Sequence, residues 1–438
     1  MKKTGIHTNQ RSNLSAGDMS LVFSKALKNN LLSPDDTSAI FYDLGFLEQR
    51  ITGLQEVFPQ NTVHAIAVKA NPLAQMLSVI QALGVGAEVA SLPELYMAQK
   101  AGFAPDTIIF DSPCKTKEEI EYALGAGVYM NADSFAELDR IAGILKTLKS
   151  TSKIGLRINP QVGTGNILST SVSGDISKFG IPMKDNKDRI VEYYQKYDWL
   201  TGIHVHIGSQ GGPAPLLVKG IRKVLDLAMK INANLEQNSG KNRIGFFDIG
   251  GGLPVSYYAD KEPVTMIQYK TILEKTCSEL FTDNWRLITE FGRYVFANAG
   301  WVASKVEYVK REPAYNILMT HVGADLFLRK CYNPGDWHHE ISLVDKSGNL
   351  KTGTDKNKYI IAGPLCFGGD VLARDLELPV AEEDDYILVH DAGAYTLSMW
   401  SRYNSRQMPK VIGYNMGNNT FSKLKNREKT NDLLAFWS

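Results

Sequence analysis

The chain of 438 residues has little of three features that would assign it to a specialised class of protein. Its four cysteines, Cys114, Cys277, Cys331 and Cys366, are far apart and form no CxxC pair, which argues against a zinc site and indicates a reducing compartment. No apolar run approaches the ~18 residues that cross a bilayer. The formal net charge is only +1, which gives no sign of a nucleic-acid or membrane-surface partner.

The amino-terminal sequence MKKTGIHTNQRSN also lacks an apolar segment behind its two lysines. We therefore expect no signal peptide and a cytoplasmic protein. The 44% hydrophobic and 22% charged residues that are present are typical of a globular protein. The length exceeds one ordinary core, so two domains, or one large barrel with an addition, are expected.

Short apolar strands alternate with helices from about residue 37 to residue 300. The strands carry few polar residues, which is typical of strands buried on both faces. Eight of them favour an α/β fold with a closed, TIM-like (β/α)8 barrel over an open sheet. They are expected at 63–68, 86–90, 107–110, 127–130, 153–158, 202–207, 245–249 and 286–290. The long connection 160–200 is expected to be a lid or substrate-side loop.

After about residue 300, apolar and polar residues alternate at every second position. Strands are expected at 302–310, 315–321, 358–362, 386–390 and 410–414, between turn clusters. This predicts a C-terminal all-β, Greek-key-like domain over 301–438. Residues 1–36, with an amphipathic helix near 19–30, are expected to join that domain, and the barrel to occupy 37–300.

One lysine directly follows the first barrel strand. The segment VHAIAVKANP at 63–72 is an apolar run, then Lys69, then the breaker Asn71-Pro72. Because active sites of such barrels lie at the carboxyl ends of the strands, Lys69 is a candidate catalytic residue. The alternative is an ordinary lysine whose stem packs and whose ammonium reaches solvent.

Ionisable and glycine residues gather at the carboxyl ends of the other strands. They are Glu88, Asp111, Arg157, His206, Gly250, Gly251, Gly252, Glu290, Gly292 and Arg293. A core packed only for stability would not concentrate them at one end. The triple glycine is expected to bind phosphate, since it lets the backbone approach an anion closely. A flexible turn is the alternative.

Two histidines alternate along the sixth strand and so face one side of it. We expect His204 to be an interior histidine with its hydrogen bonds satisfied, and His206 to lie flat against an aromatic ring. No metal site is expected, because no carboxylate or cysteine at suitable spacing accompanies the two histidines.

A phosphate cradle and a lysine in one barrel mouth indicate pyridoxal 5′-phosphate, held as a Schiff base on Lys69. A carboxylate at Glu290 would keep the pyridine nitrogen protonated and make the ring a strong electron sink. This favours carbanion chemistry such as decarboxylation of an amino acid. The alternative for Glu290 is a surface carboxylate.

Several segments together resemble the fold-type III pyridoxal-phosphate decarboxylases, most closely diaminopimelate decarboxylase and more distantly ornithine decarboxylase. They are AVKANP, LRINP, SKFGIP, HIGSQ, DIGGGLP, EFGR, GPLCFGGDVLARD and DAGAYTLSMWSRYNSR, between about residues 38 and 415. The resemblance implies Lys69 as the Schiff-base lysine, His206 stacked on the cofactor ring and Glu290 at the pyridine nitrogen. The other residues expected to bind the cofactor are Glu88, Arg157, Ser209, Gly250, Gly251, Gly252, Gly292, Arg293 and Tyr395.

The resemblance also implies roles for residues beyond the barrel. Cys366 is similar to the family's proton donor, and Tyr395 to the tyrosine that closes over cofactor and substrate. The family's cysteine loop crosses a dimer interface, which implies an obligate homodimer with shared active sites. Arg293 and Arg329 match the arginines that bind the distal carboxylate of the substrate.

The departures from the family concern the substrate. Diaminopimelate decarboxylases carry a glutamate after the cysteine that holds the distal ammonium, whereas this chain has Phe367, which can neither neutralise nor hydrogen-bond an ammonium. Tyr332 falls one place early for the family's carboxylate-binding tyrosine, and Asp370 is the one acidic residue visible beside Cys366. Phe367, Tyr332, Asp370 and Tyr395 are therefore expected substrate-binding residues, together with the two arginines.

We accordingly expect an L-amino acid with a carboxylate-bearing tail, such as a citrate-conjugated diamino acid of siderophore biosynthesis. The alternatives are meso-diaminopimelate, in lysine biosynthesis, and then an ornithine- or lysine-type substrate. An amino-acid racemase would set an arginine, not Glu290, against the pyridine nitrogen. A non-catalytic binding module would have lost Lys69 or Cys366, and both are present.

Overall fold

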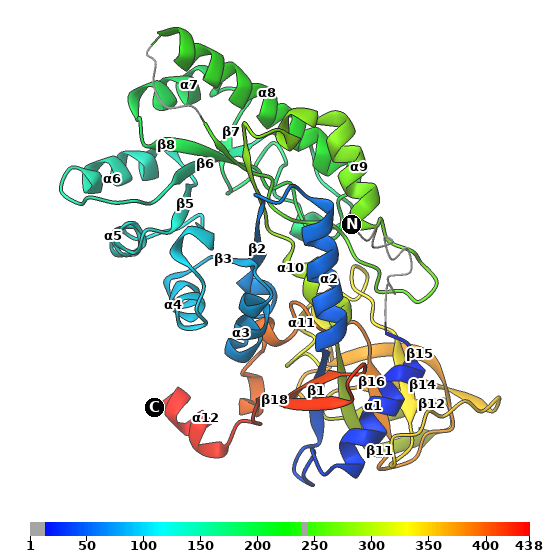
Figure 1. The fold of residues 1–438 in the computed structure, drawn as a ribbon. Helices are drawn as coiled ribbons and strands as arrows, with labels where there is room; N and C mark the ends of the chain where they lie inside the picture. The colour runs from blue at the N-terminus through cyan, green and yellow to red at the C-terminus, as the bar shows by residue number, and fades with distance from the viewer. Residues whose placement is uncertain (1–13, 239–243) are drawn as a thin grey trace. The chain divides into compact units, whose positions relative to one another are not determined.

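Two compact units make up the computed structural model, which describes residues 14–238 and 244–438 (Figure 1). The barrel unit comprises Arg50–Val255 and Val264–Val295. The β unit comprises the described residues up to Gln49, with Ser256–Pro263 and Phe296–Ser438. Residues 1–13 of the expected amino-terminal segment lie outside the described residues.

Eight parallel strands close the sheet of the barrel unit, which confirms the predicted barrel. The strands are β2 (Val63–Ala67), β3 (Gly86–Val89), β4 (Ile108–Asp111), β5 (Tyr129–Ala132), β6 (Ile154–Asn159), β8 (Leu200–His204), β9 (Phe246–Asp248) and β10 (Arg286–Thr289). β2 lies between β3 and β10, and pairing of β5 with β6 completes the circle. Because all eight strands are parallel, their carboxyl ends lie at one rim.

Glycines make room for one large side chain inside the barrel. Tyr129 of β5 is buried, and a Cβ atom at Gly155 of β6 or at Gly202 of β8 would overlap its hydroxyl group. Val63, Ile109 and Ile288 pack beside the same tyrosine. The middle of the barrel is therefore a packed core and not a pore.

Helices lie outside the barrel strands, as Figure 1 shows for α3 to α6. The helices are α2 (Leu44–Val57), α3 (Ala74–Ala82), α4 (Leu92–Lys100), α5 (Lys117–Ala126), α6 (Phe135–Leu145), α7 (Lys187–Lys196), α8 (Ala214–Asn238), α9 (Met266–Thr276) and α10 (Gly292–Phe296). Thr116 and Thr265 begin α5 and α9 with capping boxes, which satisfy backbone N–H groups that the first turn leaves free.

The connection between β6 and β8 is only partly irregular. Its first half is a loop that ends in β7 (Ile181–Pro182), a short strand paired with β6. Its second half is α7, where Ile190, Tyr193 and Tyr194 recur at helical spacing and are buried. The prediction of one long loop over 160–200 is therefore wrong for α7, because that apolar spacing builds a helix. A lid function for residues 160–180 stays a prediction.

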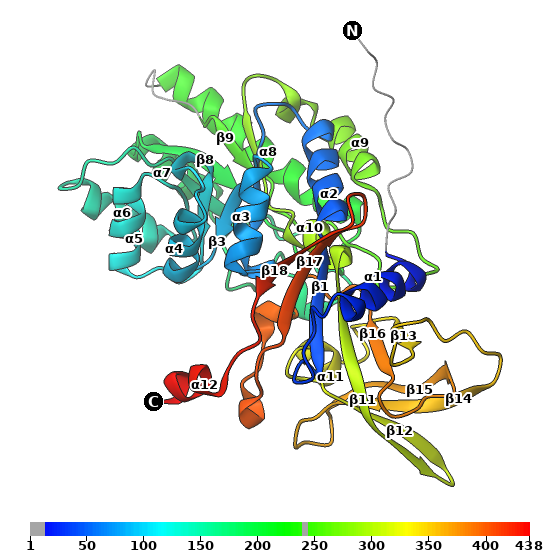
Figure 2. The same cartoon turned by 60° about the horizontal axis from the view of Figure 1, so that its bottom comes forward.

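The β unit is built on a mixed sheet. Its strands are β1 (Ser38–Asp43), β11 (Gly300–Glu312), β12 (Tyr315–Thr320), β13 (Ile341–Val344), β14 (Lys356–Ala362), β15 (Val371–Pro379), β16 (Tyr386–Val389), β17 (Lys410–Asn415) and β18 (Thr420–Lys425). The order is β15-β14-β12-β11-β1-β17-β18, and β16 pairs with both β11 and β13. Figure 2 shows β1, β17 and β18 side by side.

Because of strand β1, the boundary between the two units lies later in the chain than we expected. It is buried throughout and pairs with β11 on one side and β17 on the other. Residues 37–49, which we expected in the barrel, therefore belong to the β unit, since a buried strand needs both neighbours to satisfy its backbone.

Three further helices belong to the β unit: α1 (Ala16–Lys28), α11 (Leu328–Tyr332) and α12 (Thr430–Trp437). Phe23 of α1 packs against the rings of Phe41 and Tyr386, with centroid distances of 6.1 and 4.8 Å. The described part of the amino-terminal segment thus packs on the β unit. None of the helices within 14–238 and 244–438 is long and apolar enough to cross a membrane.

Candidate active site

Lys69 lies where the end of β2 delivers it, in a single 3-10 turn (Val68–Ala70). Its ammonium forms an ion pair with Glu88 at the end of β3. The lysine side chain is 41% exposed, whereas the Glu88 side chain is fully buried. Burial raises the pKa of Glu88 to about 8, although the Lys69 charge acts in the opposite direction. Lys69 is therefore partly exposed and pairs with a buried acid.

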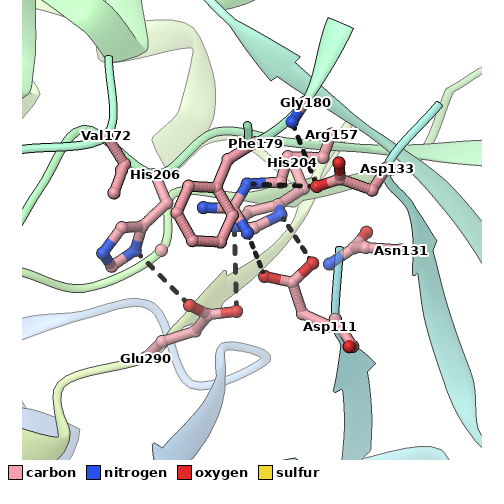
Figure 3. A network of polar contacts seen from close by, with 12 residues as sticks. Asp111, Asn131, Asp133, Arg157, Val172, Phe179, Gly180, His204, His206 and Glu290 are labelled. Atoms are coloured by element: carbon pink, nitrogen blue, oxygen red, sulfur yellow. Dashed lines mark hydrogen bonds and ion pairs between the residues drawn. The ribbon is translucent and has the colours of Figure 1, made fainter. Parts of the chain in front are cut away.

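Arg157 connects two buried carboxylates at the same rim (Figure 3). Its Nη1 donates to Asp111 Oδ2 at 2.9 Å, and its Nε lies 3.9 Å from Asp133 Oδ1. The ring of Phe179 covers the guanidinium, 4.6 Å from centroid to Cζ. Burial acts to raise the pKa of Asp111, but Arg157, His204 and Lys115 together outweigh it and the pKa falls below its usual value. Burial raises the pKa of Asp133 to about 6.

Glu290 lies between the two histidines of the sixth barrel strand and its extension (Figure 3). His204 Nε2 is 3.8 Å from Glu290 Oε1, and His206 Nδ1 is 3.6 Å from Glu290 Oε2. Burial acts to raise the pKa of Glu290, but the neighbouring His204, His206 and Lys69 hold it well below its usual range. Glu290 is therefore a buried carboxylate, and the alternative of a surface carboxylate is wrong.

The triple glycine after β9 adopts a backbone that other residues would not allow. Gly250 and Gly252 have φ angles of +64° and +98°, and a Cβ atom at Gly251 or Gly252 would overlap the carbonyl oxygen of Glu290 or Gly208. Gly251 N–H donates to His206 Nδ1 at 3.2 Å. The glycines therefore form a tight cradle between the ends of β8 and β10.

Ser209 and Arg293 approach this cradle from two loops. Arg293 Nε donates to Ser209 Oγ at 3.2 Å, and Arg293 is only 4% exposed. A Cβ atom at Gly292 would lie 2.8 Å from Ala67 Cβ, so glycine lets this segment pack against the end of β2. The barrel unit thus brings together the site residues predicted within it: Lys69, Glu88, Arg157, His206, Ser209, Gly250, Gly251, Gly252, Glu290, Gly292 and Arg293.

Arg329 in the β unit contacts two aromatic rings. Its Cζ atom is 4.8 Å from the centroid of Trp337 and 4.6 Å from that of Tyr395. Tyr395 has a φ of +57°, a conformation rare for a tyrosine and found where surrounding structure enforces it. A guanidinium is planar and presents its N–H groups in one plane, which suits a carboxylate, and contacts with two rings restrict how it can turn.

Cys366 lies on an exposed loop of the β unit that side chains hold in place. Its N–H donates to Asn404 Oδ1 at 2.8 Å, and its carbonyl accepts from the Tyr403 hydroxyl at 3.2 Å. The next residue, Phe367, stacks on Tyr332 with a centroid distance of 5.4 Å and meets the edge of Tyr403 at 6.2 Å. An aromatic cluster of Tyr332, Phe367 and Tyr403 therefore borders the cysteine.

Asp370 has a different environment from the one that we expected. It is buried, and its carboxylate accepts backbone N–H groups of Ala324 and Leu365. These bonds give Asp370 a role in holding the loop, and contact with a substrate stays a prediction.

One expectation for the histidines is wrong, and the absence of a metal site stays a prediction although its premise fails. His204 is interior, but neither ring nitrogen has a hydrogen-bond partner in the part of the chain that the structure describes. A carboxylate does accompany the histidines, because Glu290, distant in sequence, places an oxygen within 4.8 Å of a nitrogen of each. The spacing of residues along the histidine strand could not reveal Glu290, because it follows a different strand, β10.

Other residues of the site were missed by sequence reasoning. Trp337, Tyr403 and Asn404 orient groups in the β unit, and Asp133 and Phe179 flank Arg157. Phe179, Tyr403 and Asn404 lie inside the quoted segments SKFGIP and SRYNSR, which were the available signal.

Comparisons with known proteins agree with this geometry. Residues 44–297 match the family described as "Pyridoxal-dependent decarboxylase, pyridoxal binding domain", and residues 224–393 match its "C-terminal sheet domain". The chain is 32% identical over 396 residues to the diaminopimelate decarboxylase of Archaeoglobus fulgidus, covering 89% of this chain and 90% of that protein. It is 30% identical over 400 residues to the enzyme of Aquifex aeolicus, covering 90% and 89%.

Solved structures give the same result. Diaminopimelate decarboxylase of Helicobacter pylori, complexed with L-lysine, superimposes with a TM-score of 0.81 at 27% identity, covering 94% of this chain and 99% of that one. The lysine/ornithine decarboxylase of Vibrio vulnificus shares the fold, with a TM-score of 0.74 at 19% identity over 90% and 96% of the two chains. The chain therefore belongs to the pyridoxal-dependent decarboxylases, and it is a pyridoxal-phosphate-dependent carboxy-lyase.

Proposed function

We propose that this enzyme decarboxylates meso-diaminopimelate and so carries out the last carbon-removing step to L-lysine. The observation that carries the proposal is the likeness to diaminopimelate decarboxylases over about nine-tenths of both chains. A related enzyme was solved with L-lysine, which is diaminopimelate less one carbon dioxide. These comparisons favour diaminopimelate over the citrate-conjugated substrate that the sequence alone suggested.

The barrel mouth fits pyridoxal 5′-phosphate. Glu290 Oε1 is buried without a hydrogen-bond partner among the described residues, and its two lone pairs leave places for an N–H group of a ligand and for one further donor. Lys69 supplies the amine, and the glycines with Ser209 supply a cradle that a Cβ atom would fill. Once bound, this cofactor supplies an electron-poor ring that stabilises negative charge at the substrate Cα.

Each residue of the mouth then has a task. Lys69 would bind the cofactor covalently, Gly250–Gly252 and Ser209 would hold its phosphate, and His206 would lie against its ring. Glu290 would keep a proton on the pyridine nitrogen, which requires an ionised carboxylate. The pKa of Glu290 is held well below its usual range although burial acts to raise it, which supports this role.

Two residues of the β unit complete the proposal. The in-plane N–H edge of Arg329 would bind the distal carboxylate of the substrate. The exposed thiol of Cys366 would return a proton to Cα after carbon dioxide has left. We propose that it does so in the site of a partner copy, within a homodimer.

Phe367 favours a second candidate substrate. A ring stacked on Tyr332 offers no acceptor for a distal ammonium. A carboxylate-tailed amino acid without that ammonium, such as a citrate-conjugated diamino acid, avoids this unmet requirement. An ornithine- or lysine-type substrate is disfavoured, because it has the ammonium and lacks the carboxylate.

The glycine cradle predicts a loss of cofactor affinity in Gly252→Ala. The added Cβ would meet the Gly208 carbonyl oxygen, and φ of +98° would strain any other residue. We expect the dissociation constant for pyridoxal 5′-phosphate to rise at least about tenfold, measured by titrating the apoenzyme. Gly245→Ala, where nothing lies within 4 Å of the new Cβ, is the matched control. Unchanged affinity in Gly252→Ala would remove the cradle from the cofactor site.

Measuring carbon dioxide release from several candidate amino acids identifies the substrate. The reconstituted enzyme is offered meso-diaminopimelate, L-lysine, L-ornithine and a citrate-conjugated diamino acid in separate reactions. We expect rapid release from meso-diaminopimelate alone. Phe367→Glu should raise kcat/KM for meso-diaminopimelate by about tenfold, since it restores a partner for the ammonium, whereas Phe367→Leu should not. Release from the citrate conjugate and none from meso-diaminopimelate would establish the second candidate instead.

A mixture of two inactive variants tests the shared sites. Lys69→Ala and Cys366→Ala are each expected to be nearly inactive, and subunit exchange between them should restore about a quarter of the wild-type activity. The reason is that half of the dimers are then mixed, and each mixed dimer has one intact site. A mixture that stays as inactive as its components would show that one chain supplies both residues.

A further inference from the structure

His204, to which the proposed mechanism gives no task, occupies the middle of a buried row of polar atoms (Figure 3). Its Nδ1 lies 3.7 Å from Asp111 Oδ1, and its Nε2 lies 3.8 Å from Glu290 Oε1. The ring is fully buried. All four of these atoms are buried, and none has a hydrogen-bond partner within the described ranges.

The other neighbours of Glu290 and Asp111 are already engaged. Lys69 is paired with Glu88. His206 Nδ1 accepts the N–H of Gly251, so a neutral His206 ring has no proton on the nitrogen that faces Glu290. Arg157 binds Asp111 through the oxygen that His204 does not face. His204 is therefore the side chain best placed to offer an N–H to Glu290.

The ionisation of the ring agrees with a single N–H group. Burial lowers the pKa of His204 to about 4, although the Asp111 and Glu290 carboxylates act in the opposite direction. A neutral imidazole has one N–H, and its position depends on what the two nitrogens face. Arg157 already balances the charge of Asp111, whereas Glu290 lacks such a partner, so the proton belongs on Nε2.

We propose that His204 is a positioning residue, which fixes the Glu290 carboxylate and keeps it ionised toward the cofactor ring through its Nε2–H group. The inference rests on the proposed role of Glu290. Asp111 and Arg157 hold the ring from the opposite side, so the row Arg157–Asp111–His204–Glu290 acts as one support. Removing the imidazole would leave Glu290 buried without a donor, which favours the protonated acid.

Cofactor affinity and catalysis in substituted enzymes test this inference. His204→Leu should weaken pyridoxal 5′-phosphate binding to the apoenzyme by about tenfold and lower kcat for meso-diaminopimelate by about a hundredfold. KM should change little, because His204 does not touch the substrate. His204→Gln, whose amide can donate to Glu290, should recover most of both losses. His204→Asn, which is polar but too short, should behave like His204→Leu and serves if the leucine variant does not fold.

A matched control separates positioning from folding. His64 of β2 is buried, has its pKa lowered to about 4 by burial, and bonds Thr289 Oγ1 at 2.9 Å without facing the carboxylate row. His64→Leu should lower the melting temperature about as much as His204→Leu and leave cofactor affinity and kcat unchanged. Equal losses of affinity in both leucine variants would contradict the inference.

The decisive step repeats His204→Asn in a Glu290→Gln background. Because His204 acts through Glu290, its substitution should then change cofactor affinity by less than about twofold. A loss as large as in the wild-type background would overturn the inference. If Glu290→Gln alone had no effect on affinity or kcat, the proposed role of Glu290 would fail instead. Cofactor affinity needs no substrate, so an error in the substrate would not affect this test.

Discussion

The structure of the barrel mouth depends on compensating several carboxylates that are buried together. Glu88, Asp111 and Glu290 place oxygen atoms within 4.8 Å of one another. Burying one ion costs several kcal/mol unless a partner and hydrogen bonds offset it. Lys69 and Arg157 supply the two full positive charges, to Glu88 and Asp111, and the histidines adjoin Glu290.

This arrangement explains why the site lies at one rim of the barrel. Apolar strands fill the interior, with Tyr129 packed against glycines, so polar groups can be accommodated only where the strands end. The glycine cradle closes the same rim between β8 and β10, with backbone conformations that exclude other residues. In the proposed mechanism, a cofactor with a phosphate and a ring nitrogen would use both features: the cradle would bind the anion, and Glu290 would bind the nitrogen.

The sequence was enough to predict the barrel, its eight strands and the lysine at the end of the first. Each of these features depends on a short stretch of sequence, namely an apolar run and the residues that end it. The pairing of β1 with β11 and β17 could not, since a single buried strand has the same pattern in either unit. His204 shows the same limit. Its strand predicts that it points inward, but the two carboxylates that face it come from β4 and from the end of β10.

The choice of substrate is the hardest feature to predict from sequence, because it depends on residues from several distant segments. Phe367 is visible as a departure from the family, yet its effect depends on the rings of Tyr332 and Tyr403, which reach it from other segments. Likewise, the sequence around Arg329 does not show the rings of Trp337 and Tyr395 that its guanidinium contacts, and the proposal that it binds a carboxylate depends on them. The type of reaction can therefore be predicted from sequence more securely than the identity of the substrate.

The central claim is that Glu290 is ionised and keeps the cofactor nitrogen protonated. The most direct measurement is the 15N NMR signal of the reconstituted enzyme with pyridoxal 5′-phosphate labelled at its ring nitrogen. A signal typical of a protonated pyridine nitrogen, lost in Glu290→Gln, is the predicted result. An unprotonated nitrogen in the wild-type enzyme at neutral pH would contradict the account.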